Sequence, residues 1–395
     1  MDDVVPTLPA TRHRKRPGDL GRVLGAVGVA TVLLLAGAAV YTYELARAPT
    51  GEPVLTIYAY SSLFGGNGSL SVYDQVFGAF ERAHGVRIDL EYPSGTLAST
   101  LVAEKNAPGA DLVIGLDEIT APQADAHGVL LPYSPPGLSN VSPSLIATLA
   151  PDHSVTPYEY GYLSFDFNQS DFPVVPSSVQ NISFPGLASN GSLARSLVLE
   201  NPETDITGEE FLLYEIAFFE HVLNASWLPF WQSIDPHASV VDSWSTAWSE
   251  FTAPSASPAM TVSYSTDPAY AAANGAAGTI GATVASWEGV RYAWQTVYGI
   301  GIVAGSPHVT LDQEFIDWFL SGAVQSEIPT NEWEYPANNA TALPSVFSAA
   351  VNTSGLVPLD SALPPATIVS SLPGWLDDWQ SLYNVYGAST GLPGA

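Results

Sequence analysis

The chain contains no cysteine, and only 11 of its 395 residues are lysine or arginine. The lack of cysteine excludes disulfide frameworks, thiolate catalysis, iron–sulfur clusters, cysteine-ligated zinc and a lipid anchor on an N-terminal cysteine. The 39 acidic residues give a formal net charge of −28, which repels phosphate backbones and excludes nucleic acid as a partner. Hydrophobic residues make up 46% of the chain, so we expect it to fold.

Motifs for hydrolytic chemistry have no supporting context. His-Glu-x-x-His does not occur, and the 7 histidines are scattered without metal-ligand spacing. Gly-x-Ser-x-Gly occurs once, at 387–391, but it follows a predicted helix and not the strand that a nucleophile elbow requires. We therefore expect no enzymatic activity, no metal centre and no resident cofactor.

A single long apolar run is present near the N-terminus. Residues 24–43 carry no charge, and Arg12, Arg14, Lys15, Arg16 and Arg22 precede them. About 20 apolar residues span a bilayer, and basic flanks stay on the cytoplasmic side. We predict a cytoplasmic tail (1–20), a transmembrane helix (21–43), a stalk (44–52) and an extracellular remainder. The alternative is a signal peptide cleaved after Ala46-Arg47-Ala48.

The exported part is acidic and rich in glycosylation sequons. Past residue 47 only 5 basic residues remain beside 35 acidic ones. Asn-x-Ser/Thr occurs eight times, which predicts a glycoprotein; the asparagines are Asn67, Asn140, Asn168, Asn181, Asn190, Asn224, Asn339 and Asn352.

Hydrophobic patterning predicts an α/β fold built from two similar blocks. Short β-branched and aromatic runs alternate with segments of helical periodicity, which is typical of a parallel sheet with crossover helices. We expect strands at 54–60, 86–90, 111–116, 195–199, 259–264 and 297–303, and helices at 72–84, 97–105, 209–221, 227–234, 312–321 and 375–386. Ligands of such sheets bind beyond the carboxyl ends of the strands.

Six motifs, in order between residues 53 and 340, resemble those of the thiamine-binding components of ABC importers. They are Val-Leu-Thr-Ile-Tyr-Ala-Tyr (54–60), Ala-Asp-Leu-Val-Ile-Gly-Leu-Asp (110–117), Pro-Tyr-Glu-Tyr-Gly-Tyr (157–162), Asp-Ser-Trp-Ser (242–245), Val-Ser-Tyr-Ser-Thr-Asp-Pro-Ala-Tyr (262–270) and Ile-Pro-Thr-Asn-Glu-Trp-Glu-Tyr-Pro (328–336). The resemblance implies a two-lobed periplasmic-binding-protein-like fold of type II with a hinge. We place lobe 1 at 53–157 plus 287–395 and lobe 2 at 158–286.

The same resemblance implies the function and the site. The protein would be a monomer that binds thiamine in an aromatic cleft between the lobes and delivers it to an ABC permease. Its contacts would be Tyr60, Ser94, Gly95, Asp205, Trp244, Tyr264, Tyr270 and Trp333, whereas Tyr58 and Tyr160 are assigned to the core. A thiazolium cation over tyrosine or tryptophan faces gains about 0.5–2 kcal/mol per contact.

Two departures from the family pattern concern the anionic forms of the ligand. The chain has Ser94-Gly95 where the family tends to carry an acidic residue before glycine. Residues 200–208 lack the family's basic residue and carry Glu203 and Asp205, although a plain helix entry capped by Thr207 is equally compatible with them. We expect free thiamine to bind better than its phosphates, because acidic groups repel a phosphate.

Two alternatives remain open at this stage. Tyr264 and Tyr270 phenolates could instead bind Fe³⁺. The chain could also be a surface adhesin that kept the fold without binding a ligand.

Overall fold

The computed structural model describes residues 52–64, 70–172, 175–253 and 258–386. Pro53 to Ala395 forms one structural unit. The predicted transmembrane helix (21–43) and cytoplasmic tail lie outside the described residues, so both stay predictions. Within the described ranges, no helix combines the length and the hydrophobicity that crossing a bilayer requires.

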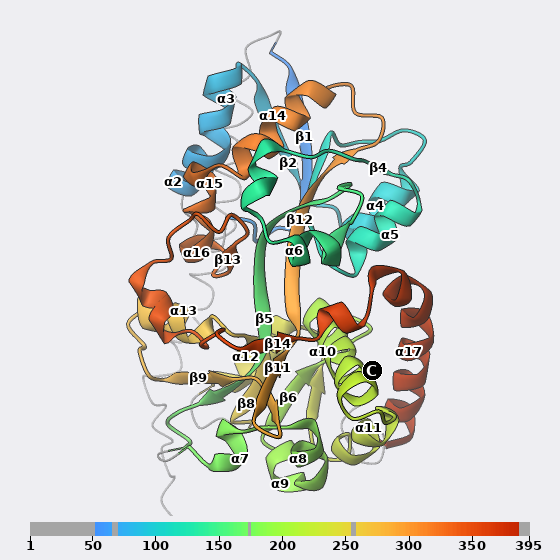
Figure 1. The fold of residues 1–395 in the computed structure, drawn as a ribbon, viewed down its shortest axis with the longest axis vertical. Coiled ribbons are helices and arrows are strands. Elements are labelled where there is room, and N and C mark those ends of the chain that lie inside the picture. The colour runs from blue at the N-terminus through green and yellow to red at the C-terminus, as the bar shows by residue number, and fades with distance from the viewer. Residues whose placement is uncertain (1–51, 65–69, 173–174, 254–257, 387–395) are drawn as a thin grey trace, which may run out of the picture. The chain divides into compact units, whose positions relative to one another are not determined.

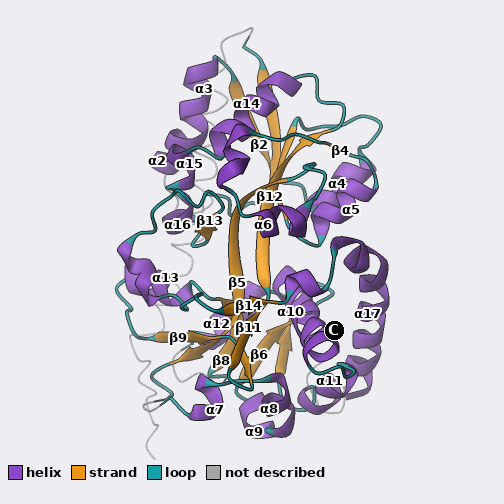
Figure 2. Cartoon of the chain, viewed as in Figure 1, coloured by secondary structure: helices purple, strands orange, loops and turns teal. Residues whose placement is uncertain are grey.

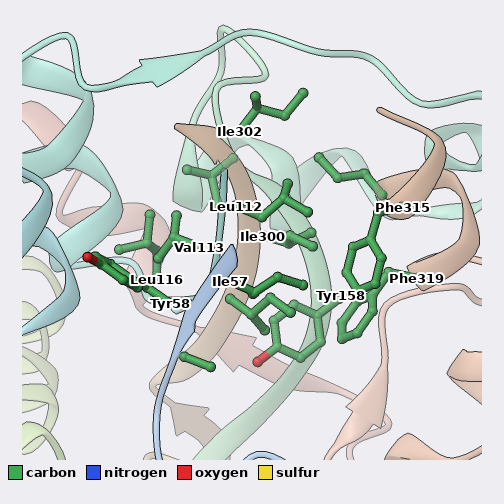
Figure 3. Packing of buried hydrophobic residues seen from close by; sticks show 14 of the residues in the cluster. Ile57, Tyr58, Leu112, Val113, Leu116, Tyr158, Ile300, Ile302, Phe315 and Phe319 are labelled. Atoms are coloured by element: carbon green, nitrogen blue, oxygen red, sulfur yellow. The ribbon is translucent and has the colours of Figure 1, made fainter. Parts of the chain in front are cut away.

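The first hydrophobic core forms around three parallel strands. β1 (Val54–Ala59) pairs in parallel with β2 (Arg87–Glu91) and with β3 (Leu112–Leu116). Their buried aliphatic side chains belong to one cluster with Phe315 and Phe319 of α14 (Val309–Phe319). Figure 3 shows Ile57 of β1 and Leu112 of β3 on the side of the sheet that faces these two rings. Further elements of this region are α2 (Leu70–Tyr73), a π-helical turn (Asp74–Gly78), α3 (Ala79–His84), α4 (Leu97–Ala103), α5 (Thr120–Ala126), β4 (Leu130–Leu131) and α6 (Pro143–Leu149). The predicted βαβ pattern of this region is confirmed.

A second core repeats the arrangement with a more aromatic interior. β6 (Leu197–Glu200) pairs in parallel with β7 (Ser239–Val241) and with β8 (Met260–Tyr264). Phe184 contacts several other rings of this core, among them Phe211 and Phe230. The helices of this region are α7 (Ser177–Gln180), α8 (Phe184–Ser189), α9 (Gly191–Ala194), α10 (Ile206–Ala217), α11 (Leu228–Ile234), α12 (Trp244–Phe251) and α13 (Asp267–Ala273).

Two long strands connect the two cores. β5 (Thr156–Asn168) and β12 (Gln295–Val303) are antiparallel neighbours at the centre of the sheet, whose order is β2-β1-β3-β12-β5-β8-β6-β7. Figure 1 shows both strands running between the two halves of the molecule. The sheet is therefore mixed rather than wholly parallel, because β5 and β12 run antiparallel to their neighbours β8 and β3.

The C-terminal part returns to the second core. α17 (Pro365–Tyr386) lies beside α11 in Figure 1, and Trp379 packs edge-on against Trp231 with ring centroids 5.6 Å apart. Leu359, Leu363, Ile368 and Leu372 are buried in the same core. The predicted boundary assigns all of 287–395 to lobe 1, whereas the packing of 359–379 favours lobe 2. The chain thus passes between the cores three times, once more than expected.

The remaining elements are short. β9 (Ile280–Thr283) pairs with β5, and β13 (Tyr335–Pro336) also pairs with β5. A separate small sheet contains β10 (Ala285–Trp287), β11 (Val290–Ala293) and β14 (Leu356–Pro358). The helices α15 (Gly322–Gln325) and α16 (Ile328–Asn331) precede β13, and Figure 2 shows all three on the same side of β5.

Candidate ligand-binding site

A cleft of about 1140 Å³ is lined by residues of both cores. From the first core it receives Tyr60 after β1, residues 92, 93 and 95–97 after β2 and Asp117 after β3; from the second it receives residues 202–207 and 209 after β6. Because parallel strands end together at one edge of a sheet, loops that are distant in sequence converge there. The cleft is therefore at the position that the strand pattern predicts.

Seven of the eight predicted contact residues line this cleft. They are Tyr60, Gly95, Asp205, Trp244, Tyr264, Tyr270 and Trp333. Ser94 is exposed and is not among the lining residues. The five predicted aromatic contacts are each half-buried, whereas Tyr58 is only 5% exposed and lies in the first core. Tyr160 packs against that core as expected.

Trp333 and Tyr270 form one aromatic wall of the cleft. Their rings meet edge-on, with centroids 5.2 Å apart, and Phe347 stacks parallel to Trp333 at 6.4 Å. Trp333 has φ of 60°, a left-handed conformation that a bulky residue rarely adopts. Trp333 lies between α16 and β13, and the Tyr270 and Phe347 rings pack against its indole.

Trp244 and Trp248 form a second aromatic surface on α12. They are four residues apart, so they share a helix face, and their rings stack with centroids 5.3 Å apart. Trp244 Nε1 donates to Ser263 Oγ at 3.0 Å, and Ser263 Oγ donates to Asp267 Oδ2 at 2.5 Å. This chain of hydrogen bonds fixes the Trp244 ring relative to the end of β8.

Carboxyl groups gather around Tyr60 at another part of the cleft. The Tyr60 hydroxyl donates to Glu332 Oε2 at 2.8 Å and lies 3.3 Å from Glu159 Oε1, while the backbone N–H of Phe64 donates to Glu332 Oε1. Glu159 Oε2 and Glu334 Oε2 have no hydrogen-bond partner in the part of the chain that the structure describes, and both residues are at most 6% exposed. We refer to Glu159, Glu332 and Glu334 as the carboxyl corner.

Burial decides the protonation of these acids. It raises the pKa of Glu332 to about 7, and it raises the pKa of Glu159 well above the usual range with help from the charges of Glu332 and Glu334. Burial and the charge of Asp267 likewise raise the pKa of Glu334 well above its usual range. The carboxyl corner thus holds protons near neutral pH, and a bound cation or an N–H donor would stabilise its ionised form.

Asp205 differs from the carboxyl corner because both of its oxygens accept hydrogen bonds from backbone N–H groups. Its Oδ1 accepts from the Thr207 N–H at 2.9 Å, and its Oδ2 accepts from the Trp244 N–H at 2.8 Å. Asp205, and not Thr207 as one interpretation proposed, is therefore the N-cap of α10. The buried Thr207 hydroxyl faces the Tyr264 hydroxyl instead, at 3.4 Å.

Sequence reasoning missed several lining residues. The carboxyl corner lies within two of the quoted motifs, 157–162 and 328–336, but its three acids were not singled out. Trp248 could have been found from its spacing of four from Trp244. Tyr298 comes from the middle of β12, where its hydroxyl lies 3.4 Å from that of Tyr264, and nothing in the local sequence marks it.

The cleft carries no basic side chain among its described lining residues. Over the described ranges, no three histidine, aspartate or glutamate side chains gather so as to hold a metal ion. The geometry thus provides aromatic faces, hydroxyls and carboxyl groups, a combination that fits a flat, cationic or N–H-rich molecule.

Comparison with known proteins agrees with this geometry. The family described as bacterial extracellular solute-binding protein matches residues 75–354. The thiamine-binding periplasmic protein of Brucella melitensis is 26% identical over 342 residues, covering 85% of this chain and 93% of the relative. That of Escherichia coli is 26% identical over 348 residues, covering 85% and 95%.

Solved structures share the fold. A periplasmic thiamin binding protein superposes with a TM-score of 0.68 at 23% identity, covering 85% of this chain and 98% of its own. Iron-bound HitA from Pseudomonas aeruginosa reaches 0.63 at 17% identity, covering 86% and 100%. The predicted two-lobed periplasmic-binding-protein-like α/β fold is thereby confirmed. Because the family match spans most of the chain, this protein belongs to the bacterial extracellular solute-binding proteins.

Proposed function

We propose that this protein binds thiamine in the cleft between its lobes and delivers it to an ABC permease in the membrane. The observation that carries the proposal is the lining of the cleft: aromatic side chains from both cores together with carboxyl groups, and no basic residue among the described ones. Its curated relatives from Brucella melitensis and Escherichia coli are thiamine-binding periplasmic proteins.

The chemistry of thiamine suits this lining. The molecule joins a flat aminopyrimidine to a permanently cationic thiazolium. Each cation–aromatic contact contributes about 0.5–2 kcal/mol, and more when water is excluded. A cation bound beside the carboxyl corner would stabilise the ionised form of these acids, which then attract it. We assign the contacts to Tyr60, Gly95, Asp205, Trp244, Tyr264, Tyr270 and Trp333; Ser94, which is exposed, is kept only as a rim residue.

The iron alternative fits the cleft less well. Iron sites use phenolates, but burial, followed by the charge of Glu210, raises the pKa of Tyr264 well above its usual range. The Tyr270 ring packs edge-on against Trp333, while the Tyr264 hydroxyl lies near Thr207 and Tyr298. These two tyrosines therefore have different partners.

Titration of intrinsic fluorescence tests the proposal. Thiamine stacked against Trp244 or Trp333 should quench tryptophan emission with a saturable dependence on concentration, whereas N-methylpyridinium, a cation without the aminopyrimidine, should bind far more weakly. Absence of any response to thiamine would contradict the proposal and favour the adhesin alternative. A coloured complex with Fe³⁺ would favour the iron alternative.

The cellular setting completes the proposal. We place the protein at the outer face of the cell membrane as a monomer, held by residues 21–43. Five sequon asparagines are exposed and accessible to glycosylation: Asn181, Asn190, Asn224, Asn339 and Asn352. Asn140 and Asn168 are half-buried, and Asn67 lies outside the described residues. Mass spectrometry of the native protein would identify both the mature N-terminus and any glycans.

A further inference from the structure

One carboxylate occupies the N-termini of two helices at the cleft. Asp205 accepts the Thr207 N–H in the first turn of α10 and the Trp244 N–H at the start of α12. These helices contain 12 and 8 residues. Asp205 itself lines the cleft. Two amide donors 37 residues apart in sequence thus converge on a single anionic group that belongs to the protein.

The surrounding backbone holds the two helix starts together. The Asn201 N–H donates to the Val241 carbonyl at 2.8 Å, and Thr204 Oγ1 donates to the Asp242 carbonyl at 3.0 Å. A Cβ on Gly208 would lie 2.6 Å from the Glu200 carbonyl oxygen, so only glycine lets α10 begin this close to the end of β6. The position of Asp205 is therefore imposed by the fold around it.

Helix N-termini are the places where proteins bind phosphate, because their free N–H groups and the helix dipole attract negative charge. Here those amides already have an acceptor. A ligand phosphate would have to displace the Asp205 carboxylate or remain beside it. The described lining offers no lysine, arginine or histidine to compensate.

We infer that Asp205 acts as a built-in anion that takes the place of a ligand phosphate, and that it makes the cleft selective for free thiamine over thiamine monophosphate and diphosphate. This inference rests on the proposed function and names the residue that would set the form of the ligand.

Neighbouring acids do not share this role. Glu210 is completely buried, and burial followed by the charges of Glu118 and Asp117 raises its pKa well above the usual range. Burial and the charge of Asp117 raise the pKa of Glu209 to about 8. Near neutral pH both groups are largely neutral. Glu203 also lines the cleft, but its Oε2 accepts from Gln380 Nε2 at 2.7 Å. Among these acids only Asp205 accepts the two helix-start amides, so we assign the selection against phosphate to Asp205.

Calorimetric titration of the exported protein at pH 7 with thiamine, thiamine monophosphate and thiamine diphosphate tests the inference. The parent should bind thiamine at least tenfold more tightly than the diphosphate. Asp205→Ser keeps a capping hydroxyl but removes the charge and frees amides, so this preference should fall at least tenfold. Asp205→Asn, which is isosteric and keeps a capping oxygen, should lower the preference by a smaller factor.

Asp242→Asn is the matched control. It removes one exposed carboxylate two residues before Trp244, outside the cleft lining, and should leave the preference unchanged. A parent that binds the diphosphate as tightly as thiamine would overturn the inference, as would an unchanged preference in both Asp205 variants while they still bind thiamine. Failure of the parent to bind thiamine at all would instead overturn the proposed function.

Discussion

Two sets of carboxyl groups line the same cleft and differ in their hydrogen-bond partners. Both oxygens of Asp205 accept backbone N–H groups, whereas Glu159 Oε2 and Glu334 Oε2 accept from no group of the described residues. Because the Asp205 carboxylate already accepts these two amide groups, they are not available to an anionic group of a ligand. In the carboxyl corner the protein has left acceptor oxygens without donors, and a buried polar group without a partner is costly. The corner is therefore the place where a ligand's N–H groups or positive charge would be most stabilising.

The largest expected loss of thiamine affinity comes from the aromatic side chains of the cleft that holds both sets of carboxyl groups. Trp333→Ala should weaken thiamine binding by about 2–4 kcal/mol, the range for central hot-spot side chains. Trp244→Ala should act similarly through α12. Calorimetry measures both. If both variants bind like the parent, the assignment of the site to this cleft is wrong.

The carboxyl corner should contribute less per residue. Glu334→Met keeps the side-chain length but removes the unpartnered acceptor, so thiamine affinity should fall by about tenfold, in line with hydrogen bonds to charged groups. Glu314→Met is the control, because Glu314 is exposed on α14 and pairs with His84 at 3.0 Å. If the Glu334 variant and the parent bind thiamine with equal affinity, the carboxyl corner does not stabilise the ligand as proposed.

Buried acids should also make the free protein more stable in acid. Burial raises the pKa of Asp235 to about 7, and both of its oxygens lack a hydrogen-bond partner over the described ranges. Between about pH 4 and pH 7 the folded chain holds this proton and the unfolded chain releases it. Stability is therefore fully present below pH 4 and is lost as the pH rises through 7. Glu118, whose pKa burial and Asp117 raise to about 8, acts in the same direction.

Thermal denaturation at pH 5 and pH 8 measures this effect. We expect a lower melting temperature at pH 8, and Asp235→Asn should reduce the difference because it removes one of the titrating groups. Asp242→Asn, which alters an exposed carboxylate, should leave the difference as it is. A melting temperature that rises towards pH 8 would show that these buried acids are not protonated in the folded state.

The smallest effect is expected from the N-terminus. Deletion of residues 1–47 should give a soluble protein whose thiamine affinity lies within twofold of the parent, since every described lining residue of the cleft lies between residues 59 and 376. A larger change would mean that the N-terminal segment takes part in binding. A native N-terminus near Pro49 would show cleavage and would remove the proposed membrane anchor.

Local sequence patterns were sufficient for most of the elements. β1, β3 and β8 begin within one residue of their predicted starts, because runs of β-branched and aromatic residues are typical of buried strands. β5 was recognised only as a motif at 157–162, although it continues to Asn168. Its length follows from pairing with β12 and β8, and such partners are not visible in a local window.

The division into lobes also depends on contacts that a local sequence window does not show. The aromatic periodicity of the last helix was visible from 375 onward, but its packing against α11 was not. Trp379 contacts Trp231, a residue 148 positions earlier, so its place in the second core depends on a long-range contact. Amphipathic patterning reports that a face is buried and does not report which core buries it.

By itself, the sequence determined the order of strands and helices, the acidic and cysteine-free composition, and the aromatic residues that end up at the strand ends, because these depend on periodicity and residue type alone. Tertiary structure decided how each polar group is partnered. Asp205 and Glu334 are both acidic residues in loop-like motifs, yet Asp205 accepts from two helix N-termini, whereas Glu334 Oε2 has no donor among the described residues. That difference arises because hydrogen bonding and desolvation depend on neighbours that only folding brings within 3 Å.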